Sequence, residues 1–433
     1  MGDSRPASLA RRANRPPIDF LSVYQSRQPL SDRRVYLRRR LTVFGVLVLI
    51  LGIIGYLAFA VLRPLPATAA TLEPTETITQ TVTQVAWPAY GNGAIGAVGF
   101  DGILSSHGAQ ESTPMASITK SVTALVVLEA MPLREGESGP QLTLTEDDQR
   151  IYTEVIAEGG SAAPVAVGSV FTERQLLEAM MLPSANNYSI TLANWAYGSV
   201  DAFLAAATAW LGTHGFAGTH LADSSGINQD SRSTPADLVK IGELVLAHPV
   251  LSEIVSQQSA DLPVIGPVTN TNKILGQGGI IGLKTGTTRV AGACLLFAAE
   301  LAVGGETVTV VGVILGAPNH KELFSSVLGL LTTVEAGFRE LPLVTEGESF
   351  GSYTTPWGST SDIVATESAS VLVWQDATVA VDVAASPLIS GAAGLDVGEA
   401  VFTVADSVID VPLELSDDLA EADTGWRITH PSD

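Results

Sequence analysis

The sequence predicts a mixed α/β (α+β) fold in which helices flank one antiparallel sheet. It also predicts a small C-terminal all-β domain and one N-terminal transmembrane helix. Three observations predict this fold: an apolar run near the N-terminus, helical patterns between early and late strand patterns, and a Val-rich C-terminal segment without helical periodicity. A chain of 433 residues is long enough for two or three domains.

The first element is the apolar run. Leu41 to Leu62 contains 22 consecutive uncharged, mostly apolar residues, and a helix of that length measures about 33 Å, enough to cross a membrane. Three arginines directly precede it, and Arg63 is the only basic residue directly after it. The positive-inside rule then predicts a basic cytoplasmic tail at 1–40, a transmembrane helix at 41–62 and an extracellular body, in a single-pass protein of the cell membrane.

Two alternatives compete with an uncleaved anchor. A signal peptide cleaved near Ala67-Thr68-Ala69 fits the small-x-small pattern, but the apolar run is longer than a usual h-region and follows a 40-residue tail. A buried core helix rarely lacks a polar face over such a length. We therefore favour the anchor.

The composition of the chain narrows the classes of partner and ligand that it is expected to bind. Residues 1–63 hold eleven arginines against three acidic residues, whereas the remaining 370 residues hold 12 basic and 42 acidic residues. A body that acidic repels phosphates, so no nucleic acid partner is expected. The single cysteine, Cys294, excludes an intramolecular disulfide and is expected to be a buried strand residue. The six histidines show no metal-ligand spacing, so we expect no metal and no cofactor, and we place most of them in loops or on the surface.

The other elements follow in order. Residues 63–84, rich in Thr, Pro and Ala, are expected to form a linker, 85–342 the main domain and 343–433 a β-rich accessory domain. Strands are expected at 94–99, 103–105, 279–285, 292–299 and 307–315, the last three as an antiparallel meander. Helices are expected at 117–130, 172–182, 187–196, 234–247 and 323–338.

Three short motifs carry the chemistry. They are Ser117-Ile118-Thr119-Lys120, Ser184-Ala185-Asn186 and Lys284-Thr285-Gly286, and two of the five lysines of the chain lie in them. Taken singly, each has a plain structural explanation as a helix cap, a turn or a strand end. Their occurrence in this order, each at an expected element boundary, favours a serine acyl-transfer site.

The first motif suits nucleophilic catalysis. A serine hydroxyl needs a base beside it, and positions i and i+3 of a helix share a face, so Lys120 is expected next to Ser117. The Ser117 N–H, at a helix start, is free to serve as an oxyanion donor. Burial and the charge of Lys284 are expected to lower the pKa of Lys120, which must be neutral to act as a base. Ser184 is expected to relay a proton, and Asn186 to hold Lys120 and a substrate amide.

The third motif suits peptide binding. An exposed strand edge can pair with an extended peptide, and Gly286 lets the substrate backbone approach closely. Lys284 and Thr285 are expected to hold an anionic substrate terminus.

The motifs and their surroundings resemble the D-alanyl-D-alanine carboxypeptidases, the low-molecular-mass penicillin-binding proteins, over about residues 85–340. The stretches that carry the resemblance are Pro114 to Leu125, Met181 to Asn187, Asp223 to Ile227 with Ser233 to Asp237, and Gly282 to Thr288 with Ala291-Gly292.

The resemblance implies a penicillin-binding-protein/β-lactamase-like transpeptidase domain. It also implies acylation of Ser117 by peptidoglycan stem peptides with release of terminal D-alanine, and covalent inhibition by β-lactam antibiotics. It assigns Lys120 as the base of both steps and the second oxyanion N–H to Thr287.

The chain departs from the family at three positions. Ala185 replaces the usual glycine, Thr287 replaces a common His, Tyr or Phe, and no arginine for the substrate carboxylate follows the last core strand, which leaves Lys321 and Arg289 as substitutes. No amphipathic helix is expected at the C-terminus, so anchoring falls to the N-terminal helix.

Three other functions were weighed. A DD-endopeptidase with the same residues and a penicillin-binding receptor or wall-binding module without turnover remain alternatives. A β-lactamase is disfavoured because no glutamate is positioned as a deacylation base.

Overall fold

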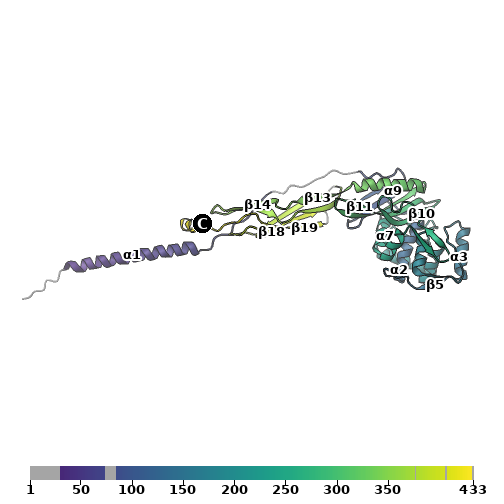
Figure 1. The fold of residues 1–433 in the computed structure, drawn as a ribbon, viewed down its shortest axis with the longest axis horizontal. Helices are drawn as coiled ribbons and strands as arrows, with labels where there is room; N and C mark the ends of the chain where they lie inside the picture. The colour runs from purple at the N-terminus through teal and green to yellow at the C-terminus, as the bar shows by residue number, and fades with distance from the viewer. Residues whose placement is uncertain (1–29, 74–83, 376, 405–406, 432–433) are drawn as a thin grey trace, which may run out of the picture.

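The computed structural model describes residues 30–73, 84–375, 377–404 and 407–431. Most of the expected cytoplasmic tail (1–29) and the segment 74–83 of the expected linker lie outside the described residues. Three parts follow one another along the long axis: helix α1 (Leu30–Leu62), a β domain and a larger mixed domain (Figure 1). The predicted mixed α/β fold with an N-terminal apolar helix and a β-rich C-terminal region is confirmed.

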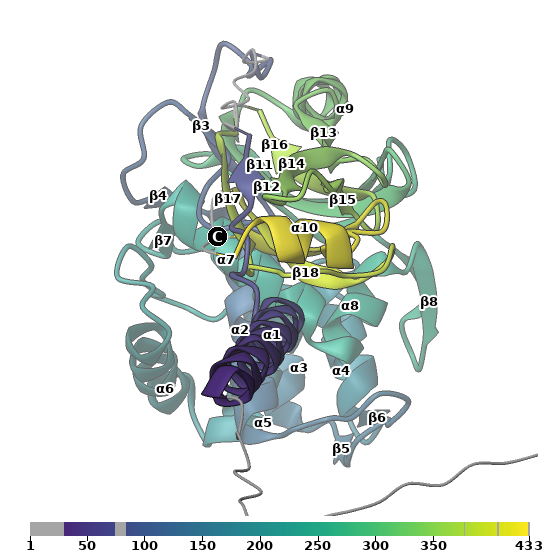
Figure 2. The same ribbon diagram turned by 90° about the vertical axis from the view of Figure 1, so that its left-hand side faces the viewer.

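Helix α1 extends further toward the N-terminus than the predicted 41–62. Its stretch Arg33–Leu62 is long and apolar enough to cross a membrane, by length and composition. Its side chains are exposed almost throughout, with Ala60 the buried exception among those described. Figure 2, which looks along the long axis, shows α1 nearest the viewer, below α10 and the strands of the β domain and in front of the helices of the mixed domain.

The mixed domain is built on a five-stranded antiparallel sheet with the order β10-β11-β12-β2-β3. The strands are β2 (Asn92–Ala97), β3 (Ser105–His107), β10 (Ile280–Thr288), β11 (Gly292–Val303) and β12 (Glu306–Ala317). The predicted meander is confirmed, and the predicted early hairpin adds to its far side with shifted ends. Within the described residues, β10 is therefore an edge strand.

Helices cover both faces of this sheet. One face carries a 3-10 turn and seven helices, which are η1 (Ala116–Ile118), α2 (Thr119–Ala130), α3 (Glu146–Ala157), α4 (Glu173–Met181), α5 (Asn186–Tyr197), α6 (Val200–Thr213), α7 (Pro235–Ala247) and α8 (Pro249–Ser256). The other face carries α9 (His320–Glu335). Apolar strand residues facing the two sides pack into two separate cores, because successive strand side chains alternate between faces.

Three short antiparallel strand pairs complete the mixed domain. They are β4 (Thr113–Pro114) with β7 (Arg232–Ser233), β5 (Gln141–Thr143) with β6 (Val170–Thr172), and β8 (Ser259–Leu262) with β9 (Gly266–Thr269).

The β domain has a six-stranded antiparallel sheet with the order β1-β14-β15-β19-β18-β17. Its strands are β1 (Thr71–Leu72), β14 (Ser349–Thr354), β15 (Thr360–Ala365), β17 (Val379–Ala385), β18 (Asp396–Val404) and β19 (Ser407–Leu415). Strand β1 belongs to the segment expected to be a plain linker. That segment is instead paired into the β domain, since Thr71 and Leu72 lie opposite Ser352 and Gly351, and Thr68 bridges Leu388.

An aromatic cluster joins the two domains. Strands β13 (Phe338–Val344) and β16 (Ala369–Trp374) pair directly after α9. Phe338 packs edge-on against Phe100 of the mixed domain and against Trp374, with ring centroids 5.3 and 4.6 Å apart. The indole N–H of Trp374 donates to the Leu104 carbonyl at 3.2 Å, so β16 is fixed to the mixed domain.

A short C-terminal helix, α10 (Thr424–Thr429), was not expected from the sequence. It lies beside the end of α1: Arg427 donates to the Val61 carbonyl at 3.1 Å, and the Tyr56 hydroxyl donates to the Ile428 carbonyl at 2.5 Å. The expectation that no amphipathic helix follows the β domain is not tested by α10, which has only six residues.

Candidate active site

Ser117 lies in the 3-10 turn η1, directly before α2, as the first motif predicts. The preceding residue, Ala116, has a left-handed φ of 49°, which a non-glycine residue rarely adopts. Gly226 packs against this turn, and a Cβ atom on it would lie 1.8 Å from the Ala116 carbonyl oxygen. The turn is thus held in a strained conformation by a neighbour that must be glycine.

The amine of Lys120 lies beside the Ser117 hydroxyl. Its Nζ is 3.0 Å from Ser117 Oγ, 2.8 Å from Asn186 Oδ1 and 2.9 Å from the Ser225 carbonyl oxygen. The side chain of Lys120 is fully buried. Helix α2, the start of α5 and the loop after α6 therefore converge on one amine.

The surroundings of Lys120 favour its neutral form. Burial lowers the pKa of Lys120 well below its usual value, the charge of Lys284 lowers it further, and Asp223 opposes both effects. A neutral amine has two N–H bonds and one lone pair. The carbonyl oxygens of Asn186 and Ser225 can accept the two N–H groups, which leaves the lone pair for the Ser117 hydroxyl.

The loop that carries Ser225 is organised by Asp223. The Asp223 carboxylate accepts hydrogen bonds from the backbone N–H groups of Ser225 at 2.9 Å, of Asn228 at 2.6 Å and of Gly226. Thr123 of α2 donates to the Ser224 carbonyl at 2.8 Å and fixes the loop to the helix. The stretch Asp223 to Ile227 was noted in the sequence because it resembles the family. The contact of its Ser225 carbonyl with Lys120 is seen only in the structure.

The second motif forms the turn between α4 and α5. Ser184 is nearly buried and has a left-handed φ of 64°, and Asn186 is the first residue of α5. The Asn186 N–H donates to the Ser161 carbonyl at 2.7 Å. Within the described residues, the hydrogen-bond partners of Lys120 Nζ are Ser117, Asn186 and Ser225, so the expected relay through Ser184 remains a proposal.

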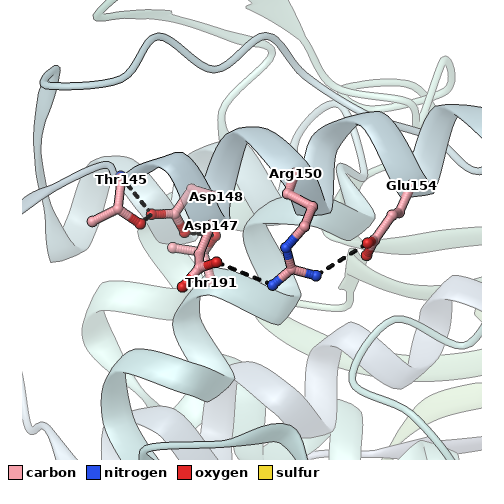
Figure 3. A network of polar contacts seen from close by, with 6 residues as sticks. All are labelled: Thr145, Asp147, Asp148, Arg150, Glu154 and Thr191. Atoms are coloured by element: carbon pink, nitrogen blue, oxygen red, sulfur yellow. Dashed lines mark hydrogen bonds and ion pairs between the residues drawn. The ribbon is translucent and has the colours of Figure 1, made fainter.

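Helix α3 holds α5 in place (Figure 3). The Thr191 hydroxyl of α5 donates to Asp148 at 2.6 Å, and Asp148 also caps α3 through the Thr145 N–H at 2.8 Å. Arg150 bridges Asp147 and Glu154 on the exposed side of α3, where ion pairs contribute little. Of these contacts, the half-buried Asp148–Thr191 hydrogen bond is the one that links α3 to α5, the helix that begins at Asn186.

The third motif lies on the edge strand β10. A Cβ atom on Gly286 would lie 3.0 Å from the Ser117 backbone nitrogen, so the strand passes close to the turn η1 that contains Ser117, here called the nucleophile turn. Lys284 is buried, donates to the Thr285 carbonyl at 3.1 Å, and has its pKa lowered by burial to about 7. Thr285 is buried too and bonds Thr271 at 2.6 Å, which leaves Thr287 as the exposed hydroxyl of this segment.

His320, expected to be a loop or surface residue, instead reaches this site. It is half-buried at the first position of α9, and its Nε2 lies 2.6 Å from the Thr287 hydroxyl. The register explains this contact, because Thr287 lies opposite Ala293, and Ala293 lies opposite Ala317, three residues before His320.

In the part of the chain that the structure describes, the two residues offered as replacements for the family's carboxylate-binding arginine form no hydrogen bond with Thr287. Arg289 and Lys321 are both exposed, on the turn after β10 and on the first turn of α9. Among the described residues, the titratable side chain that forms a hydrogen bond with Thr287 is His320, which neither prediction named. Cys294 is buried in β11 as predicted, and burial raises the pKa of its thiol to about 11.

Comparison with known proteins identifies the family. The profile of the family described as D-alanyl-D-alanine carboxypeptidase (Peptidase_S11) matches residues 100–319, which is half of the chain. The chain belongs to this family. The predicted resemblance is confirmed, and the family supports hydrolase and penicillin-binding functions in the cell wall.

Individual relatives agree with this assignment. A D-alanyl-D-alanine carboxypeptidase of Streptomyces sp. (strain K15) is 31% identical over 224 residues, which cover 47% of this chain and 74% of the relative. A D-alanyl-D-alanine endopeptidase of Pseudomonas aeruginosa is 28% identical over 201 residues, covering 45% of this chain and 62% of the relative. Penicillin-binding protein 5 from Haemophilus influenzae has a similar fold, with a TM-score of 0.54 at 18% identity over 81% of this chain and 100% of that structure.

Proposed function

We propose that this family member is a membrane-anchored serine D-alanyl-D-alanine carboxypeptidase that removes the terminal D-alanine of peptidoglycan stem peptides. The observation that carries the proposal is the buried amine of Lys120, 3.0 Å from Ser117 Oγ, with its two other hydrogen-bond positions filled by carbonyl oxygens. This arrangement supplies the neutral base that a serine nucleophile requires.

The reaction proceeds in two balanced steps. Lys120 takes the Ser117 proton while Oγ attacks the carbonyl of the penultimate D-alanine, and the proton passes to the amine of the terminal D-alanine as the C–N bond breaks. We assign this second transfer to Lys120 with Ser184 as relay. Water then gives a proton to Lys120 and attacks the ester carbonyl. As the bond from this carbonyl to Ser117 Oγ breaks, Lys120 returns the proton to Oγ, which frees Ser117 and restores the neutral amine.

Strand β10 contributes both to the proposed oxyanion hole and to the proposed peptide-binding site. The N–H groups of Ser117 and Thr287 are the proposed oxyanion donors, and the close approach of Gly286 to the Ser117 nitrogen supports this pairing. The free edge of β10 offers hydrogen bonds to an extended stem peptide. Asn186, Lys284 and Thr285 complete the proposed binding residues.

A β-lactam uses the same residues. Opening of its strained amide by Ser117 Oγ forms an ester while the amine stays tethered to the acyl group. That amine cannot diffuse away, which explains how a covalent adduct persists.

The proposed location follows from α1. We assign α1 as a single membrane-spanning helix with the arginine-rich side in the cytoplasm and both domains outside the cell. The β domain, placed between α1 and the mixed domain, then acts as a spacer from the membrane (Figure 1).

A DD-endopeptidase that cleaves cross-links is the second candidate. It is favoured by the relative named D-alanyl-D-alanine endopeptidase, at 28% identity. The same acyl-enzyme chemistry serves both reactions, because they differ in whether the leaving amine carries a free carboxylate or a further peptide.

The test measures D-alanine release from a pentapeptide ending in D-Ala-D-Ala, with full-length protein in detergent micelles and Ser117→Ala as control. We expect release by the wild type and none by the variant. A cross-linked dimer assayed in parallel separates the two candidates. Acylation by a fluorescent penicillin without turnover of either peptide would instead support a receptor.

A further inference from the structure

The contact between His320 and Thr287 lies at the mouth of the candidate active site. Thr287 is exposed and follows Gly286, the residue that touches the Ser117 turn. The Thr287 hydroxyl also donates to the Gly286 carbonyl at 2.7 Å. A hydroxyl has one proton to donate, so its second contact, to His320 Nε2, is one in which it accepts.

This direction of donation fixes the form of the imidazole. If Nε2–H donates to Thr287, a neutral ring carries no proton on Nδ1. Nδ1 of His320 is buried and has no hydrogen-bond partner among the described residues. A lone pair is a cheaper group than an N–H to leave unpaired there, so burial favours the same tautomer.

Most of the charged residues close to His320 in the sequence or along the strands are basic. Lys284 on β10 lies near enough to lower the pKa of His320, after the larger effect of burial. The other charged residues of the elements that meet here are Arg289 after β10, Lys321 and Glu322 on the first turn of α9, and Glu335 at the far end of α9. The acidic residues of β11 and β12, Glu300 and Glu306, lie toward the opposite ends of those strands.

We propose that His320 is a positioning residue, which holds the Thr287 hydroxyl so that its proton is offered to the terminal carboxylate of the substrate. When the carboxylate arrives, the hydroxyl turns from the Gly286 carbonyl to the ligand while Nε2–H continues to donate to Thr287. Protonation of His320 adds a positive charge next to the carboxylate. This inference rests on the proposed carboxypeptidase function and concerns its selectivity.

The consequence is a pH-dependent preference for a free C-terminus. A guanidinium would carry its charge at every physiological pH, whereas the pKa of His320 lies below the usual histidine value. Preference for a carboxylate over an uncharged end should therefore increase as the pH falls toward that pKa.

The test compares two thioester substrates of Ser117 that differ only in the leaving group, one ending in a carboxylate and one in its methyl ester. The measured quantity is the ratio of their kcat/KM values between pH 5 and 8, with full-length protein in detergent. Taking the ratio within each variant cancels any change in acylation that both substrates share.

Two matched variants separate position from charge. In His320→Gln the side-chain amide can reach the position of Nε2 but does not titrate, so we expect a ratio near that of the wild type at pH 8. We expect a smaller rise at low pH than in the wild type, because only Lys284, with a pKa of about 7, then gains charge beside the carboxylate. In His320→Asn the amide is too short to reach Thr287, so we expect the ratio to fall about tenfold at all pH values. In Thr287→Val, the further change His320→Asn should leave the ratio unaltered.

The outcomes are distinguishable. A wild type that reacts with neither substrate contradicts the proposed function itself. A wild type that reacts with both, and variants that keep its ratio and its pH dependence, would overturn the role of His320 alone. If His320→Asn does not fold, the pH dependence of His320→Gln decides.

Discussion

At the scale of single residues, the proposed chemistry depends on the amine of Lys120. We expect Lys120→Arg to lower the rate of Ser117 acylation by roughly 10²–10⁴-fold, because a guanidinium keeps its proton and cannot act as a base. The measurement is the rate of labelling by a fluorescent penicillin. Lys240→Arg, on the exposed side of α7, is the matched control and should label at the wild-type rate. Equal labelling of both variants would exclude Lys120 as the base.

Gly286 makes a second prediction at this scale. A Cβ atom there would lie 3.0 Å from both the Met115 carbonyl oxygen and the Ser117 nitrogen, so Gly286→Ala should push β10 away from the nucleophile turn. We expect acylation to slow about 10–100-fold, since misplacement by a fraction of an ångström weakens an oxyanion donor. Gly305→Ala, in the turn between β11 and β12 where an added methyl meets nothing within 4 Å, should have no effect on the same rate.

The residues with motif spacing were the predictable ones. Ser117 and Lys120 lie one helical turn apart, so their contact follows from sequence alone. The contact between His320 and Thr287 crosses three strands, and its prediction requires the register of β10, β11 and β12. The Ser225 carbonyl was equally hidden, because a backbone group has no sequence signal of its own.

At the scale of elements, Glu173 opens α4 as a buried carboxyl. Neither of its oxygens has a hydrogen-bond partner among the described residues, and burial raises its pKa from 4.5 to about 7. A raised folded-state pKa means that the folded protein holds this proton more tightly than the unfolded chain. The resulting stability is fully present below pH 4.5 and is lost as the pH rises through 7.

Glu173→Gln should therefore flatten the pH dependence of stability between pH 4.5 and 8. We expect the difference in Tm between the variant and the wild type to be a few degrees more favourable to the variant at pH 8 than at pH 5. Differential scanning calorimetry at both pH values measures it. Glu146→Gln is the control, because Glu146 also opens a helix after a threonine cap but is exposed. Parallel Tm profiles for all three proteins would show that Glu173 is ionised at neutral pH.

Helix-capping motifs predicted the helices better than the pattern of apolar residues did. Thr172 with Gln175, and Thr234 before Pro235, mark the starts of α4 and α7 as expected. Helices α3, α6 and α8 were not predicted. Helix α3 does carry a reciprocal Thr145–Asp148 cap, but with aspartate in place of the usual glutamate or glutamine.

At the scale of the whole molecule, the segment before the mixed domain is built into the β domain. Its Thr and Pro content resembles a linker, and nothing local shows that Thr71 and Leu72 pair with a strand some 280 residues later. Such long-range pairing is set by the folded sheet, not by the segment. Gly351 permits it, because a Cβ atom there would lie 2.3 Å from the Thr71 carbonyl oxygen.

Gly351→Ala is expected to detach β1 while leaving acylation by penicillin unchanged. Amide hydrogen exchange should become about tenfold faster at Glu73, whose N–H donates to the Phe350 carbonyl at 2.9 Å. Gly358→Ala is the control, since Gly358 also has a positive φ but an added methyl meets nothing within 4 Å. Unchanged exchange at Glu73 in Gly351→Ala would show that β1 pairing is not set by this contact.

The pairing of β1 also determines how the protein carries mechanical load. The chain enters the β domain from α1, and its C-terminal helix α10 returns to the end of α1, so both attachments lie at the same end (Figure 1). The strands of the sheet run along the long axis, so a wall that pulls on the mixed domain pulls along them. Hydrogen bonds loaded in that direction shear together instead of opening one at a time. In the proposed membrane-anchored protein, the β domain would then act as a stiff strut that keeps the candidate active site at a fixed distance from the membrane under tension.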